Sequence, residues 1–219
     1  MQSNRERLRL VLRLVTTRGA DILARKSLAQ YIRQLRQYAR DYFTEKLDDT
    51  VFLDKMIAAI GDQINRAWNE GMRSNGLDPA KDKTDAMRAR VDELVRNEQN
   101  HVTNLADLIN NQRNAGRDDM VAINARVDVW ANRYIDVVNI AKAETAPPEQ
   151  MLEWVYGDTQ HCETCFALNG TVLSAAEWGA SRYHPQQPPN KDLECGGWRC
   201  KCKLMKTKKK RTGLPQGLQ

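Results

Sequence analysis

The sequence has 219 residues, with 34 Lys and Arg against 28 Asp and Glu, and 41% of its residues are hydrophobic. This composition excludes collagen-like and low-complexity chains. No run approaches the ~18 uncharged apolar residues of a membrane span. The apolar segment Leu8–Val15 is interrupted by Arg9 and Arg13 and precedes no small-residue cleavage site, so we expect no signal peptide.

Charge is distributed unevenly along the chain. Residues 1–40 carry ten basic and two acidic side chains, residues 41–200 carry 17 and 26, and residues 201–219 carry seven basic ones and no acidic one. Two basic ends therefore flank an acidic middle, and a basic run near the C-terminus is able to neutralise phosphates or an acidic protein surface. A solvated, mobile terminus is the simpler interpretation. The run comprises Lys206, Lys208, Lys209, Lys210 and Arg211.

The first 145 residues have the pattern of successive helices. Apolar residues recur at steps of three and four, which predicts amphipathic helices, and turn-forming residues separate them at 75–79 and 114–116. Stripes of this kind indicate packing between helices rather than catalysis. The stripes are Leu28, Ile32, Leu35, Ala39 and Tyr42; Leu53, Ile57, Ile60, Ile64 and Ala67; Met87, Val91 and Leu94; and Ile123, Val127, Trp130, Tyr134, Val137 and Ala141.

The composition changes at Pro147-Pro148, a pair that cannot continue a helix. The following residues are rich in Gly, Pro, Cys and Trp, with short β-prone segments at 154–156 and 170–173. We therefore predict a mainly α fold: an elongated helical body at 1–145, a small Cys-rich, zinc-stabilised α+β module at 146–204, and a basic, flexible tail at 205–219. A module of this size needs disulfides or a bound metal, because its small hydrophobic core alone gives only marginal stability.

All five cysteines lie in this module. An odd number without a secretion signal does not suit a disulfide framework, so we expect a metal site. A C-x-x-C knuckle comes first and a second cluster follows thirty residues later, and four thiolates at ~2.3 Å suit a closed, structural zinc site. Which four bind is left open. The candidate ligands are Cys162, Cys165, Cys195, Cys200 and Cys202, with His161 and His184 in reserve.

Two local features favour convergence of the second cluster on one ion. Gly196 and Gly197 allow backbone amides to turn toward the sulfur of Cys195 without Cβ clashes. Residues two apart in a strand share a face, so Cys200 and Cys202 are expected to point the same way.

Enzyme interpretations fit the sequence poorly. His161-Cys162-Glu163 spells the H-x-E of zinc deaminases, but no P-C-x-x-C follows. A redox C-x-x-C is expected in a βαβ setting, which the helical region upstream does not offer. Three histidines in the whole chain limit general acid–base schemes. We therefore predict a protein that is not an enzyme.

From the last long helix onward, the order of parts is familiar. A helix at 121–143 leads to a Trp-containing strand, a C-x-x-C followed by Leu-Asn-Gly, a second Trp, a Pro-rich loop and a Cys-rich close. In this order and spacing the chain resembles the phage head morphogenesis, or minor head, protein family (phage Mu F-like). The segments that carry the resemblance are 153–158, 162–170, Trp178, 183–190 and 193–204.

The resemblance implies a virion component present in few copies at the portal vertex, found in the host cytoplasm during assembly. Its expected partners are the portal and other head proteins, and its expected role lies in head assembly, DNA packaging or ejection. The basic ends suit contact with packaged DNA. Neither a membrane nor a small-molecule substrate is expected. The alternative is a zinc-ribbon nucleic-acid-binding protein whose basic termini supply the affinity.

Overall fold

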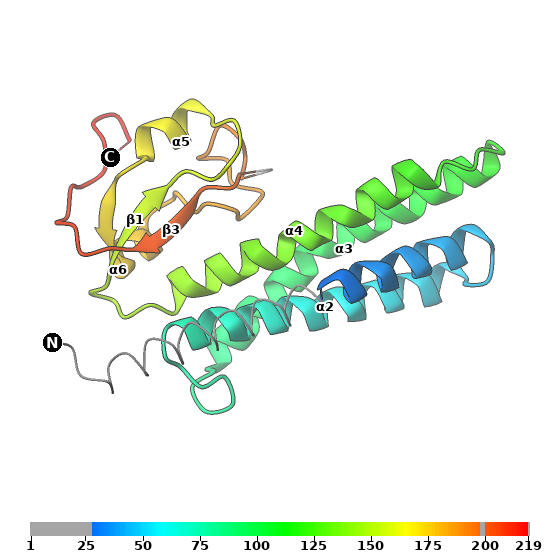
Figure 1. The fold of residues 1–219 in the computed structure, drawn as a ribbon, viewed down its shortest axis with the longest axis horizontal. Coiled ribbons are helices and arrows are strands. Elements are labelled where there is room, and N and C mark those ends of the chain that lie inside the picture. Colours follow the sequence, from blue (N-terminus) through cyan, green and yellow to red (C-terminus); the bar gives the residue numbers. More distant parts are fainter. Residues whose placement is uncertain (1–27, 198–199, 219) are drawn as a thin grey trace, which may run out of the picture. The chain divides into compact units, whose positions relative to one another are not determined.

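The computed structural model describes residues 28–197 and 200–218, so the basic residues ahead of residue 28 lie outside it, as do Trp198 and Arg199. A mainly helical chain followed by a small α+β module is confirmed (Figure 1). Residues 28–43 are helical. The elements that follow are α2 (Asp49–Ser74), α3 (Asp85–Asn114), α4 (Met120–Glu144), β1 (Met151–Val155), α5 (Glu163–Leu168), β2 (Val172–Ser174), α6 (Ala175–Ala180) and β3 (Lys203–Lys206).

The chain divides into two compact units. Of the described residues, one unit comprises 28–59 together with Glu98–Ala131, and the other comprises Ile60–Asn97 together with those from Asn132 onward. The three long helices each contribute to both units, and the small sheet belongs to the second. The domain boundaries expected after residues 145 and 204 remain predictions.

The first unit has a helical core whose register differs in part from the predicted one. In the first half of α2, Leu53 and Ile57 are only partly buried, whereas Phe52 and Met56 are fully buried. The stripe is displaced by one position because the ring of Phe52 stacks on that of Tyr42, with centroids 4.3 Å apart. From Ile60 onward the predicted and observed stripes coincide: Ile60, Ile64 and Ala67 are buried.

A buried carboxylate in the first unit has a partner that periodicity did not indicate. Glu98 of α3 is buried, and its carboxylate accepts a hydrogen bond of 3.0 Å from the indole nitrogen of Trp130 in α4. A buried polar group without such a partner would cost about 1–3 kcal/mol. The pair therefore lets a charged residue occupy the apolar side of α3.

In the second unit, α2 and α4 approach each other closely. A Cβ added at Gly71 would lie 2.4 Å from the Cβ of Ala141 and 2.8 Å from the carbonyl oxygen of Val138, so this position leaves no room for a side chain. Just beyond the end of α2, Asn75 donates hydrogen bonds to the carbonyl of Lys142 and to the hydroxyl of Thr145. These contacts fix the end of α4, which stops before the proline pair as predicted.

The C-terminal module is built on a three-stranded antiparallel sheet in the order β2-β1-β3. Trp154 of β1 and Trp178 of α6 are fully buried, with ring centroids 5.7 Å apart, and the indole of Trp178 donates to the carbonyl of Leu152. A capping box between Ser174 and Glu177 begins α6. The two β-prone segments are thus confirmed as strands, with boundaries shifted by one to three residues.

The residues after Leu204, for which a flexible tail is predicted, make several contacts with the module. Lys206 ends β3, and the backbone of Thr212 donates to the carbonyl of Val172. Lys209 pairs with Glu153 at 2.6 Å, and Arg211 pairs with Glu177 at 2.6 Å. A run of basic side chains in a sequence is usually interpreted as solvated, but here Glu153 of β1 and Glu177 of α6 supply acidic partners for two of them.

Among the described residues, no helix has the length and apolarity needed to cross a membrane.

Candidate metal centre

The first two cysteines are positioned by the start of α5. Cys162 is the N-cap of this helix, and its sulfur accepts a hydrogen bond from the backbone N–H of Cys165 at 3.4 Å. The sulfur thus takes the place of the hydroxyl or carboxylate that usually satisfies a free N–H at a helix start. Cys165 faces the core and is only 1% exposed, whereas Cys162 is half-buried.

Cys195 comes from a separate loop, where two consecutive glycines make the tight turn expected from the sequence. Gly196 and Gly197 have φ values of 63° and 77°, in the left-handed region that favours glycine. A Cβ on Gly197 would also lie 3.1 Å from the backbone nitrogen of Pro188. The loop therefore holds Cys195, half-buried, against the C-x-x-C turn.

Cys200 and Cys202 are both buried, but not for the reason that strand alternation suggested. β3 begins only at Lys203, so both cysteines precede the strand. The chain there is held by Gly157, where an added Cβ would lie 2.2 Å from the carbonyl oxygen of Lys201. Sequence reasoning missed Gly157. The one available signal was a glycine directly after a β-prone run, which is often a close backbone approach.

All five thiols are free and converge. The sulfurs of Cys162, Cys165 and Cys195 lie within 4.8 Å of one another, as do those of Cys165, Cys200 and Cys202. The sulfurs of Cys165 and Cys200 are 3.9 Å apart. A tetrahedral ion with bonds of about 2.3 Å requires sulfurs separated by about 3.8 Å. The cluster therefore has the chemistry and the spacing to hold a metal ion.

The two reserve histidines lie in different places. The Nδ1 atom of His161 is 3.5 Å from the sulfur of Cys202, and its ring stacks on Tyr156 with centroids 4.0 Å apart. His184 lies instead in a pocket beside α4, and the structure does not bring it to the described cysteine groups.

The pKa values of the five thiols are shifted in different directions. Hydrogen bonds from Cys165 and then Cys200 lower the pKa of Cys202 to about 3, and the backbone N–H of Gly157 acts in the same direction. The hydrogen bond to Cys200 raises the pKa of Cys165, and burial raises the pKa of Cys195 to about 11. A packed set of thiols thus holds negative charge at Cys202, which a cation would stabilise.

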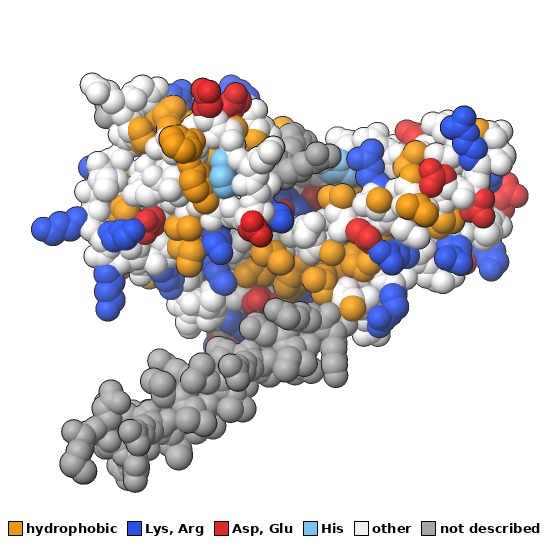
Figure 2. Space-filling model, turned by 45° about the horizontal axis from the view of Figure 1, so that its top comes forward, with side chains coloured by type: hydrophobic (Ala, Val, Ile, Leu, Met, Phe, Trp, Pro, Cys, Tyr) orange, Lys and Arg blue, Asp and Glu red, His pale blue; other side chains and the backbone are white. Residues whose placement is uncertain are grey.

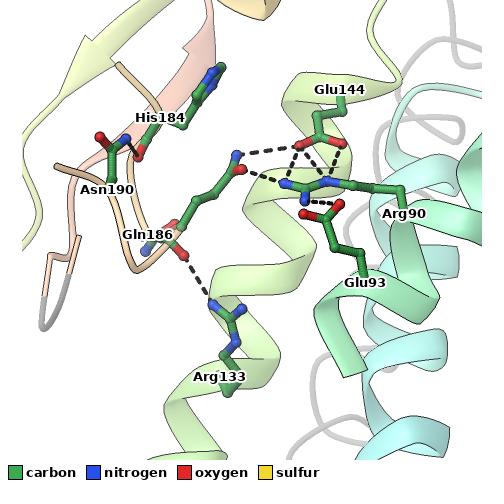
Figure 3. A network of polar contacts seen from close by, with 8 residues as sticks. Arg90, Glu93, Arg133, Glu144, His184, Gln186 and Asn190 are labelled. Carbon is green, nitrogen blue, oxygen red and sulfur yellow. Dashed lines mark hydrogen bonds and ion pairs between the residues drawn. The ribbon is translucent and has the colours of Figure 1, made fainter. Parts of the chain in front are cut away.

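A second feature of this unit is a cavity of about 670 Å³ bordered by a polar network (Figure 3). Arg90 of α3 pairs with Glu93 at 2.7 Å and with Glu144 of α4 at 3.1 Å, and it also donates to Gln187. The two carboxylates more than neutralise the guanidinium, so Arg90 offers no free positive charge to an anion in the cavity. The network ties the loop around Gln187 to both helices.

The same loop is held at a second point. Arg133 of α4 donates a buried hydrogen bond of 3.0 Å to the carbonyl of Gln186, and Asn190 donates to the carbonyl of His184 (Figure 3). Burial lowers the pKa of His184, which favours its neutral form. The loop thus leads from the cavity to Cys195 along a fixed path, and sequence periodicity gave no indication of these contacts.

The predicted basic contact residues do not form one free surface. Lys209 and Arg211 are occupied by Glu153 and Glu177, while Lys206, Lys208 and Lys210 are exposed. On the face drawn in Figure 2, Lys and Arg side chains are scattered, with Asp and Glu side chains between many of them.

The chain matches no protein-family model, no curated protein and no solved structure.

Proposed function

We propose that the cysteine cluster binds zinc as a structural ion and that the chain acts through protein contacts rather than catalysis. The observation that supports the zinc assignment is the convergence of five thiols, three in the core of a small module and two packed against it. Thiolate-rich, tetrahedral sites favour zinc among the common divalent ions. In small zinc domains the binding free energy, ~10–16 kcal/mol, is largely folding free energy.

The test compares two neighbouring substitutions in the full chain. Cys165→Ser removes the thiol that belongs to both groups of three sulfurs. The variant should therefore retain no zinc when it is purified in a buffer free of chelators. Thr164→Ser is the matched control, since it keeps the hydroxyl that accepts from the backbone of Glu194. Metal content is measured by mass spectrometry of the purified proteins. Equal zinc in the two variants would overturn the assignment.

We infer further that the chain is a minor head protein of a bacteriophage, associated with the portal. The support is that the segments which carry the resemblance belong to one folded module. Trp154, Trp178, Cys165, Cys200 and Cys202 all lie in its core. In this role the module is a rigid docking element, and the protein works in head assembly, DNA packaging or ejection.

The direct test is quantitative mass spectrometry of purified particles and procapsids from the phage or induced prophage that encodes the chain. The proposal predicts a few to a dozen copies alongside the portal protein, and resistance of the portal contact to nuclease. Absence from both particle types would refute it.

The alternative is a zinc-ribbon protein that binds nucleic acid. It is favoured by the exposed ammonium groups of Lys206, Lys208 and Lys210. It predicts duplex DNA binding with a steep salt dependence, because each neutralised phosphate releases a counterion. Fluorescence anisotropy of the wild type and of a Lys208→Ala/Lys210→Ala variant with duplex DNA at two salt concentrations tests this alternative. Weaker binding and a shallower salt dependence in the variant support it, and unchanged DNA binding at low salt refutes it.

A further inference from the structure

We propose that the cysteine cluster holds two thiophilic metal ions, with the thiolate of Cys165 bridging them. The proposal deepens the zinc assignment above and rests on it. One ion is bound by Cys162, Cys165 and Cys195, and the other by Cys165, Cys200 and Cys202.

The first argument is geometric. The two groups of three sulfurs share Cys165 alone, and among the described residues no group of four ligand atoms lies within 4.8 Å of one another. Any four of the five sulfurs therefore include one pair separated by more than 4.8 Å. A single tetrahedral ion needs all six separations near about 3.8 Å, so it requires a shift of roughly 1 Å or more. Two ions bridged by Cys165 use both groups as they stand.

The second argument concerns charge. One dication bound by four thiolates carries a net charge of −2 beside a fifth, protonated thiol, whereas five thiolates with two dications carry −1. Three of these cysteines are buried, at exposed fractions of 1% for Cys165, 8% for Cys200 and 0% for Cys202. Uncompensated charge is costly in such surroundings, so the second ion lowers the penalty.

The two sites differ in what surrounds them. The inner site is buried, and Nδ1 of His161 lies 3.5 Å from the sulfur of Cys202 without belonging to that group of three. The outer site has two half-buried cysteines, Cys162 and Cys195, so it is less enclosed than the inner site. The outer ion is therefore the more easily exchanged.

The experiment is a titration of the full-length chain with Cd²⁺, read by native mass spectrometry and by ¹¹³Cd NMR. We expect saturation at two ions per chain and two resonances in the thiolate-rich range. Cys195→Ser should saturate at one ion, because it removes a ligand of the outer site alone. Thr164→Ser should keep both ions and serves as the matched control.

Each outcome separates this inference from the zinc assignment. Saturation of the wild type at one ion with a single resonance refutes the second ion and leaves the structural zinc proposal intact. Binding of no ion refutes both proposals. Two ions in Cys195→Ser would refute the outer site as assigned, even with two ions in the wild type. A misfolded Cys195→Ser would be recognised by its circular dichroism, and the wild-type count then decides alone.

Discussion

The contact between Gly157 and Lys201 makes a sharp test of the metal centre, because it can be perturbed without touching a ligand. Gly157→Ala adds one Cβ, which would lie 2.2 Å from the carbonyl oxygen and 2.5 Å from the carbonyl carbon of Lys201. Both are backbone atoms, so no side-chain rotation relieves the clash. Restoring a normal separation requires the segment containing Cys200 and Cys202 to move by roughly 1 Å.

The expected loss follows from the narrow tolerance of metal sites. Ligand distances vary by about ±0.2 Å, so a displacement of roughly 1 Å at two ligands misplaces both sulfurs. Changes in the residues that orient ligands lower metal affinity by about 10- to 100-fold. That range corresponds to about 1.4–2.7 kcal/mol. Gly157→Ala should therefore bind Zn²⁺ about 10- to 100-fold more weakly than the wild type.

The assay is competition for Zn²⁺ between the full-length chain and a chromophoric chelator at fixed pH. Gly179→Ala is the matched control, since nothing lies within 4 Å of the Cβ it adds in α6. This control should match the wild-type affinity within about twofold, a difference of about 0.4 kcal/mol. Equal affinities for the two alanine variants would refute the claim that Gly157 positions the ligands.

Two further predictions concern stability. In α2, Gly71→Ala places a Cβ 2.4 Å from that of Ala141. Overpacking costs about 3 kcal/mol and the better helix propensity of alanine returns about 1 kcal/mol, so Tm should fall by about 4–8 °C. Gly61→Ala meets only valine methyls at 3.7 Å, and the gain in helix propensity should raise Tm by about 2–4 °C. Shifts of equal sign in thermal melts would contradict this reasoning. Hydrogen bonding to the backbone of Ser174 lowers the pKa of Glu177, so the carboxylate stabilises the fold above its ordinary pKa of 4.5 and this stabilisation is lost as the pH falls. Glu177→Gln should therefore reduce the fall of Tm between about pH 5 and 3. The same slope of Tm against pH in the variant and the wild type would count against a stabilising role of the capping box.

The sequence was sufficient to predict features that depend on local spacing. Helical periodicity identified the long helices, and the proline pair identified the end of α4. The proximity of Cys162 and Cys165 was predictable because they lie three positions apart and a single turn at the start of α5 brings them together. These features were predictable because their determinants lie within a few residues of one another.

Features that depend on distant residues were not predictable in the same way. The displaced stripe in α2 follows from a stack of Phe52 on Tyr42, which periodicity does not encode. The ion pairs of Lys209 and Arg211 join the C-terminal residues to β1 and α6, and a charge run gives no sign of such partners. The close approach of Gly157 to Lys201 likewise depends on how two loops meet.

The pairing of β1 with β3 has a consequence for the order of events during synthesis. Trp154 in the middle strand faces Leu204, fifty residues later, and the cysteines that close the cluster are made only shortly before that partner. The long helices depend on local contacts and form quickly, whereas so distant a strand pair is slow. The nascent module therefore waits with one edge of β1 unpaired. If the proposed site is filled in this order, an ion held first by the C-x-x-C turn would bind the later cysteines as they emerge and bring β3 to its place, and metal supply would then set how fast the protein matures.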